Sequence, residues 1–145
     1  MKYSKFPPKV SSRFDLWDKF APFCVDPDNT WIGPNVVIGQ GTIIEPNVYI
    51  FDREDGRSSI IGKNCHIGTN VKLRGWFEIG DEVRLGHCAE VVRSKIGNQT
   101  KASHWCHIGD AIVGRGCNIA AGVIFCNYDG KYKRQTIVGD NVFIG

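Results

Sequence analysis

Residues 61–91 read IGKNCHIGTNVKLRGWFEIGDEVRLGHCAEV, and the spacing within this stretch decides the fold. An aliphatic side chain returns at every sixth position, from Ile61 to Val91, and glycine follows four of these six residues. An α-helix repeats every 3.6 residues and a strand every 2, so neither sustains a period of six. A hexapeptide period instead predicts a parallel β-helix, in which each hexad forms one short strand and one turn.

The same period extends in both directions from this stretch, with breaks after Ile50 and Phe125 and two steps of five residues. We call the periodic positions anchors. They are Ile32, Ile38, Ile44, Ile50, Ile61, Ile67, Leu73, Ile79, Leu85, Val91, Ile96, Ala102, Ile108, Val113, Ile119, Phe125, Val138 and Ile144. Three hexads close one triangular coil, so the chain should form about six coils with the anchors pointing inward. Glycine makes up 17 of the 145 residues and often follows an anchor, where we expect it to permit backbone φ values that a β-carbon resists.

Length and composition describe one soluble globular domain and exclude several classes of function. The chain has 145 residues and a net charge of +3, which is too balanced to indicate nucleic-acid binding. No apolar stretch is long enough to span a membrane, and the N-terminus lacks the apolar core of a signal peptide. Six cysteines without a CxxC pair favour free, buried thiols over disulfides. We therefore expect a cytoplasmic protein.

Residues 1–29 lie outside the repeat and differ from it in pattern. The segment Arg13–Phe23 carries aromatic residues at a helical spacing of three. We expect it to cap the open end of the solenoid, where apolar anchors and strand edges would otherwise meet water, with a binding role as the alternative. The expected domains are thus an N-terminal cap at 1–29 and the β-helix at 30–145.

Two insertions interrupt the coils, and function tends to reside in such loops. The first is Phe51–Ser59, FDREDGRSS, which is either a substrate or subunit-contact loop or a solvated turn. The second is Cys126–Gln135, CNYDGKYKRQ, which combines an amide, two tyrosines and three cations. This composition suits an anionic ligand such as a sugar phosphate or nucleotide, although an exposed basic loop has the same composition.

Among the four histidines, His104 is the best candidate for a catalytic base, because acyl transfer to an amine needs a group that titrates near neutrality. A structural or surface role is the alternative when only the residues are considered. His104 and His107 are three residues apart, a strand spacing that puts them on opposite sides. We therefore expect no metal site.

The repeat resembles that of the hexapeptide acyltransferases over Thr30–Gly145. The resemblance implies an all-β fold, a left-handed parallel β-helix, and a homotrimer with parallel prism axes. The stretch from Ser103 to Gly145, SHWCHIGDAIVGRGCNIAAGVIFCNYDGKYKRQTIVGDNVFIG, is similar to the acetyltransferase domain of the bacterial bifunctional glucosamine-1-phosphate acetyltransferase/N-acetylglucosamine-1-phosphate uridylyltransferases. It implies transfer of an acetyl group from acetyl-CoA to an amino sugar, with no metal required.

The resemblance also implies roles for individual residues. His104, within KASH, corresponds to the catalytic histidine, and the remaining positions correspond to groups that bind or support the sugar substrate. These substrate-binding candidates are Arg74, Glu90, Arg93, His107, Asn118, Asn127, Tyr128 and Lys133.

Several departures from the family leave the acceptor open. His107 replaces a tyrosine, and Val92 replaces a lysine for which the neighbouring Arg93 is a substitute. The uridylyltransferase domain is missing, so the acceptor is an amino sugar, its phosphate or a nucleotide sugar. The chain stops at Gly145, before the coils that carry much of the acetyl-CoA site in the family, and we expect a truncated C-terminal end. The alternative is a non-catalytic trimeric β-helix that binds or assembles and has lost acetyl-CoA binding.

Overall fold

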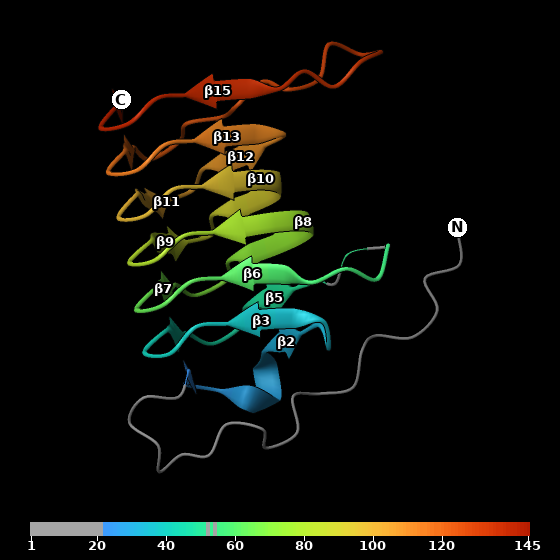
Figure 1. The fold of residues 1–145 in the computed structure, drawn as a ribbon, viewed down its shortest axis with the longest axis vertical. Coiled ribbons are helices and arrows are strands. Elements are labelled where there is room, and N and C mark those ends of the chain that lie inside the picture. The colour runs from blue at the N-terminus through green and yellow to red at the C-terminus, as the bar shows by residue number, and fades with distance from the viewer. Residues whose placement is uncertain (1–21, 52, 54) are drawn as a thin grey trace.

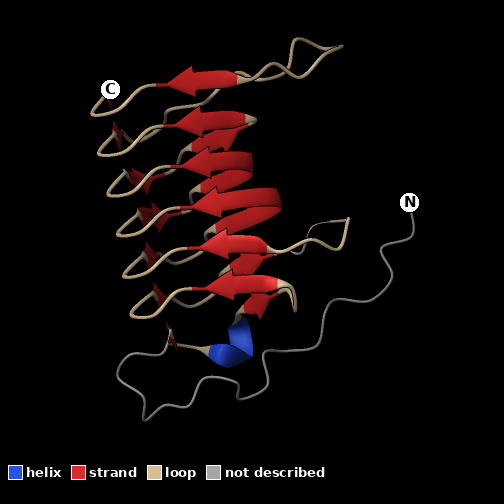
Figure 2. Cartoon of the chain, viewed as in Figure 1, coloured by secondary structure: helices blue, strands red, loops and turns tan. Residues whose placement is uncertain are grey.

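A computed structural model describes residues 22–51, 53 and 55–145. It is a left-handed parallel β-helix with strands stacked in columns, which confirms the predicted fold (Figure 2). A single short 3-10 helix, η1 (Pro27–Asn29), lies at the N-terminal end of the described part. The strands are β1 (Phe23–Cys24), β2 (Trp31–Ile32), β3 (Val36–Ile38), β4 (Ile43–Ile44), β5 (Tyr49–Ile50), β6 (Ser59–Ile61), β7 (His66–Ile67), β8 (Lys72–Ile79), β9 (Arg84–His87), β10 (Glu90–Ile96), β11 (Lys101–His104), β12 (His107–Gly109), β13 (Ala111–Val113), β14 (Asn118–Ile119), β15 (Thr136–Val138) and β16 (Phe143–Ile144).

The strands form the three faces of a prism. Face A is the sheet β1-β4-β7-β9-β11-β14-β16. Face B contains β2, β5, the first halves of β8 and β10, and β12, whereas face C contains β3, β6, the second halves of β8 and β10, β13 and β15. Strands β8 and β10 bend around the corner between faces B and C, so these two faces join into one hydrogen-bonded sheet.

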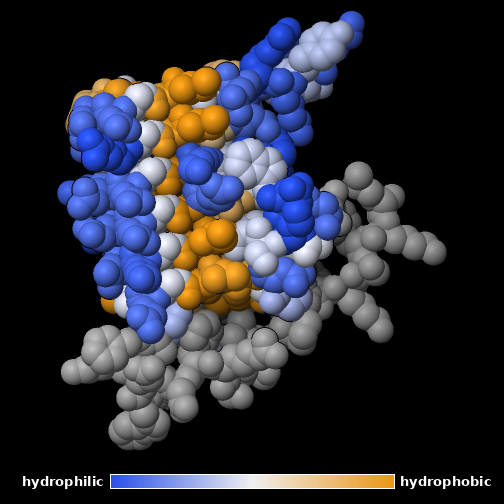
Figure 3. Space-filling model, in the orientation of Figure 1, coloured by the Kyte–Doolittle hydropathy of each residue, from blue (hydrophilic) through white to orange (hydrophobic). Residues whose placement is uncertain are grey.

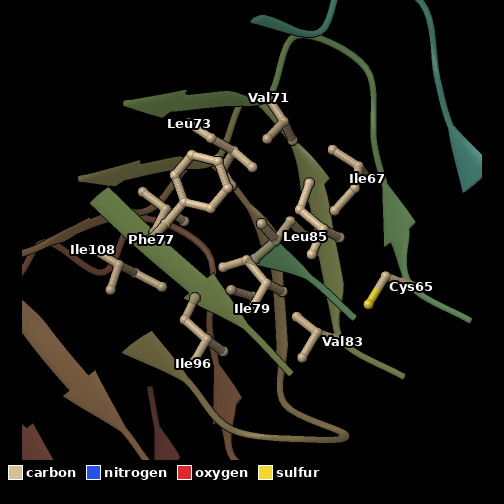
Figure 4. Close-up of a cluster of buried hydrophobic side chains, with 14 of the residues drawn as sticks. Cys65, Ile67, Val71, Leu73, Phe77, Ile79, Val83, Leu85, Ile96 and Ile108 are labelled. Atoms are coloured by element: carbon tan, nitrogen blue, oxygen red, sulfur yellow. The ribbon is translucent and has the colours of Figure 1, made fainter. Parts of the chain in front are cut away.

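The anchors fill the interior of the prism, as the hexapeptide period predicts. Fourteen of them are buried, and Ile32, Ile38, Val138 and Ile144 are partly buried and pack against the others. On face A the register pairs Ile44 with Ile67 and Ile67 with Leu85, so each anchor stacks on its counterpart in the next coil. Figure 4 shows part of the buried cluster that results, with Ile67 and Leu85 among the labelled side chains. Their burial is the main source of stability, since each fully buried aliphatic side chain contributes about 1.5–3 kcal/mol.

The glycines that follow the anchors serve close packing rather than unusual backbone angles, so the predicted reason for them is wrong. None of the glycines that follow an anchor has a positive φ. A Cβ built on Gly62 or Gly114 would lie 2.6 Å from the carbonyl carbon of the glycine in the next coil, which is too close for a side chain. Positive φ values fall instead at turn residues such as Asn47 and Asn70, a conformation that asparagine tolerates.

The corner between faces B and C collects the irregular features of the chain, and we call it the B–C corner. Gly75, Arg93 and Asp110 turn this corner in successive coils, each with a positive φ. Arg93 and Asp110 mark the two steps of five residues. The loop before β6 and the loop before β15 project from one side of the prism (at right in Figure 1). The fold therefore brings both insertions to the same side.

Other expectations have mixed outcomes. All six cysteines are free, but only four are buried: Cys88 is half-buried and Cys126, which begins the second insertion, is exposed. Burial raises the pKa of the Cys106 thiol to about 11, so this thiol stays protonated at neutral pH. In the described part of the chain, no helix is long and apolar enough to cross a membrane. Residues 1–21 of the predicted N-terminal cap at 1–29 lie outside the described residues.

Candidate active site

Three of the predicted substrate-binding residues meet on the outer side of face B. Arg74 Nε donates a hydrogen bond of 2.7 Å to Oε1 of Glu90, and Oε2 of the same carboxylate lies 2.9 Å from Nδ1 of His107. Each residue comes from a different coil, and the parallel register sets Glu90 directly beside His107. We call these residues the face B group. Because strands in register hold side chains of neighbouring coils together, the prism fixes this arrangement without a loop.

The positive charge of Arg74 keeps the Glu90 carboxyl of the face B group ionised. Burial opposes ionisation of Glu90, but the hydrogen bonds and positive charge of Arg74, together with the His107 imidazole, hold the pKa of this carboxyl below its usual range. An ionised carboxylate can only accept, so Nδ1 of His107 donates the hydrogen bond to Oε2 of Glu90. The group thus presents a guanidinium and an oriented imidazole on one surface.

A second set of contacts follows the B–C corner. Arg93 donates two hydrogen bonds to Asp110, at 2.5 and 2.7 Å, and the side-chain amide of Asn127 donates to the same carboxylate. Gly109 lies between these contacts and the face B group. A Cβ on Gly109 would lie 2.7 Å from Nε2 of His107 and 2.5 Å from Nδ2 of Asn127, so any larger residue would displace these two side chains from their positions.

Asp110 should make the stability of the chain depend on pH. The two hydrogen bonds from Arg93 hold the pKa of Asp110 below its usual value of about 3.9, with smaller effects from Asn127 and Lys133. The folded state therefore takes up this proton less readily than the unfolded state. The resulting stabilisation is fully present above about pH 4 and is lost as the pH falls through the folded pKa.

Replacing Asp110 with asparagine should lower the free energy of unfolding by about 1.5–3 kcal/mol at neutral pH, the scale of hydrogen bonds to charged groups. The gap to wild type should persist at pH 5 and shrink at pH 3, as measured by urea unfolding. Glu78→Gln is the matched control, because it removes an exposed ion pair with Lys95 (2.8 Å) and should cost under about 1 kcal/mol. An equal gap at pH 7 and pH 3 would contradict this role for Asp110.

His104 lies at the corner between faces A and B, at the end of β11. Its side chain is exposed, and among the described residues no side-chain hydrogen bond or ion pair joins it to the face B group. Trp105, with a positive φ, turns the chain so that His107 begins the next face. His104 and His107 therefore lie on different faces of the prism. The prediction that they lie on opposite sides of one strand is wrong, because the chain turns a corner between them. In the described part of the chain, no group of three or more His, Cys, Asp or Glu side chains could hold a metal ion.

The remaining predicted residues are spread over two other places. Asn118 lies on the outer side of face A, where β14 pairs with β11. Tyr128 and Lys133 pair with each other across the second insertion through an isolated antiparallel bridge. Both are exposed, and the Tyr128 hydroxyl donates to the Gly130 carbonyl at 2.7 Å. Within one chain, the structure thus brings together Arg74, Glu90, Arg93, His107 and Asn127. Lys133 lies close enough to Asp110 to lower its pKa, whereas His104, Asn118 and Tyr128 make no side-chain hydrogen bond to this set among the described residues.

Several residues of this surface were not predicted from the sequence. Asp110 accepts hydrogen bonds from Arg93 and Asn127. The sequence feature that could have predicted these contacts is the coil length, because positions 93 and 110 are separated by 17 residues and so are positions 110 and 127. The first insertion also contributes: Arg53, Asp55 and Trp76 line a hollow of about 330 Å³ together with Gly75 and Arg93. Asp55 binds both Arg53 and Arg57, so the insertion is organised by ion pairs and lies against the B–C corner.

Comparison with known proteins places this geometry in a family. The profile described as "Bacterial transferase hexapeptide (six repeats)" matches residues 58–93. A bifunctional protein GlmU from Clostridium novyi is 41% identical over 83% of this chain and 33% of its own length. The chain belongs to the hexapeptide-repeat family. A GlmU protein from Chromobacterium violaceum is 42% identical over 77% of the chain and 23% of its own length.

A solved structure supports the same fold. A hexapeptide transferase family protein from Anaplasma phagocytophilum has a TM-score of 0.55 and 21% sequence identity, over 83% of this chain and 67% of that one. This hexapeptide-repeat chain spans about a third or less of the length of the curated relatives it matches. The similarity therefore concerns only a part of the length of those relatives.

Proposed function

We propose that the chain is an acetyl-CoA-dependent N-acetyltransferase whose acceptor is an amino sugar that carries a phosphate. The observation that supports this most is the face B group. Arg74 supplies a guanidinium suited to a phosphate, and the oriented imidazole of His107 and the carboxylate of Glu90 suit the hydroxyl and amino groups of a sugar. The sequence resemblance to the acetyltransferase domains supplies the reaction.

In the proposed reaction, His104 accepts a proton from the acceptor amine as the nitrogen attacks the thioester carbonyl carbon of acetyl-CoA. The new C–N bond forms, the C–S bond breaks, and the thiolate of coenzyme A leaves. Backbone N–H groups along a coil would stabilise the oxyanion of the tetrahedral intermediate. The exposed position of His104 supports this role, because its imidazole is open to a substrate.

The site is proposed to be completed by a second copy of the chain in a homotrimer. The separation of His104 from the face B group supports this, as does the second insertion, which projects from its own prism (Figure 1). Face C carries Val37, Ile60, Ile112 and Ile137 in one register column, with the Glu78–Lys95 ion pair between them. Figure 3 shows these hydrophobic patches interrupted by hydrophilic side chains. Such a strip suits contact with other copies, and sedimentation equilibrium should give the mass of three chains.

The proposal is tested by release of free thiol from acetyl-CoA, with glucosamine, glucosamine 1-phosphate and a nucleotide-linked amino sugar as acceptors. A phosphorylated acceptor should give turnover, and Arg74→Ala should raise its KM by about tenfold or more, the scale of a lost charge-assisted hydrogen bond. Arg84→Ala, which removes an exposed arginine from face A, is the matched control. No thiol release with any acceptor, and no heat of acetyl-CoA binding, would favour the non-catalytic binding module.

A further inference from the structure

A pair of aromatic side chains lines a hollow on face B, next to the face B group. Tyr49 in β5 and Phe51 directly after it are two residues apart, so both point outward. Their rings are nearly parallel, with centroids 6.5 Å apart and an interplanar angle of 17°. Nζ of Lys72 lies 5.8 Å from the centre of the Phe51 ring. With Asn47 and Asn70, these side chains line an open surface hollow of about 320 Å³, a volume within the range of small-molecule sites.

Tyr49, Phe51 and Lys72 are not part of the buried interior of the prism, so core packing does not explain them. Tyr49 is 39% exposed, although the same register position in the next coils carries the polar residues Lys72 and Glu90. No hydrogen bond in the described part of the chain involves the Tyr49 hydroxyl. The two asparagines are explained by their positive φ values, so the aromatic pair and Lys72 are what point to a ligand.

The chemistry of the hollow selects a planar ring that carries an anion. Flat aromatic faces bind a nucleobase by stacking, and a lysine ammonium binds phosphate as a point charge. The amides of Asn47 and Asn70 supply both donors and acceptors for the edge of a ring. A nucleoside phosphate combines these features in one molecule.

The position of the hollow relates it to the proposed acceptor site. Lys72 and Arg74 are two residues apart on β8 and point outward from the same face, about 7 Å apart along the strand. Lys72 also pairs in register with Tyr49 on one side and Glu90 on the other. A phosphate chain between Arg74 and Lys72 would therefore set an attached base over the aromatic pair.

We propose that Tyr49, Phe51 and Lys72 form a nucleoside-phosphate subsite. The inference rests on the proposed function and makes the substrate there a nucleotide conjugate. Two substrates of the reaction have this chemistry: an amino sugar linked to a nucleoside diphosphate, and coenzyme A, which carries adenosine phosphates. The subsite distinguishes both from a simple sugar 1-phosphate, whose pyranose is not a planar aromatic ring and cannot stack as a nucleobase does.

The test is isothermal titration of the full chain with uridine 5′-diphosphate, adenosine 3′,5′-bisphosphate and inorganic phosphate. At least one nucleotide should bind more tightly than phosphate, and Phe51→Ala should weaken that nucleotide by about tenfold, the effect of losing one stacked ring. Phe23→Ala, which removes an exposed ring from face A, should leave the affinity unchanged. Loss with the uridine nucleotide assigns the subsite to the acceptor, and loss with the adenosine nucleotide assigns it to the coenzyme.

The subsite is overturned if neither nucleotide binds more tightly than phosphate, or if Phe51→Ala and Phe23→Ala have equal effects. Binding needs no turnover, so the two proposals fail separately. A chain that binds a nucleotide through Phe51 but transfers no acetyl group keeps the subsite and loses the proposed function. An active chain whose nucleotide affinity is indifferent to Phe51→Ala keeps the function and loses the subsite.

Discussion

His104→Ala should lower kcat for acetyl transfer by about 100-fold or more, the usual contribution of a general base. The remaining binding groups stay in place, because the His104 side chain is exposed and has no side-chain hydrogen-bond partner among the described residues. KM should therefore change little, and the thermal unfolding midpoint should match that of wild type. The measurement is thiol release from acetyl-CoA with the acceptor that gives turnover in the panel above.

The pH dependence separates a base from a residue that only shapes the surface. A base accepts a proton only when it is neutral, so acid pH should lower kcat/KM of the wild-type chain. This acid limb should be missing from the residual activity of His104→Ala. His66→Ala removes another histidine, which binds Glu45 at 2.6 Å on face A, and should keep both the rate and the acid limb. Wild-type turnover in His104→Ala would assign the proton transfer to another group.

The period of the sequence predicted the scaffold because burial in a β-helix follows a one-dimensional rule. Each anchor must point inward, so its position along the chain is enough to predict its burial. The same period could not predict which side chains touch across coils. Arg93, Asp110 and Asn127 meet because these coils are 17 residues long, and that length depends on how each corner is turned. The face B group was predicted only by resemblance, although its contacts follow from the same register.

Two other errors have a common physical cause. Glycine after an anchor suggested an unusual backbone angle, but at Gly62 the decisive factor is the backbone of the next coil. Cys126 was expected to be buried, but it begins an insertion that leaves the prism. In both cases the outcome depends on how whole coils are arranged, and the sequence of a single hexad does not determine that arrangement.

Phe77 is the largest side chain in the fully buried interior, and its position breaks the pattern of the hexads. It lies two residues before the anchor Ile79, where the neighbouring coils carry the much smaller Ser59 and Ser94. The register sets Phe77 opposite Ser94 and gives its backbone N–H a contact of 3.4 Å with the Ser59 hydroxyl. Figure 4 shows the ring inside the cluster, beside Leu73. Small residues on both sides therefore leave the volume that the ring fills.

Phe77→Ala should lower the free energy of unfolding by about 3–5 kcal/mol, because the rigid coils above and below cannot collapse into the space of the ring. For a chain of this size, this corresponds to a fall of about 10 °C in Tm. Phe143→Ala, which truncates a phenylalanine that is 70% exposed on face A, is the matched control and should cost under about 1 kcal/mol. Both are measured by thermal and urea unfolding at one protein concentration, since association would otherwise shift the midpoints. Equal losses of unfolding free energy in the two variants would contradict this prediction. They would mean that the interior relaxes around the missing ring and that the stacked coils are not rigid.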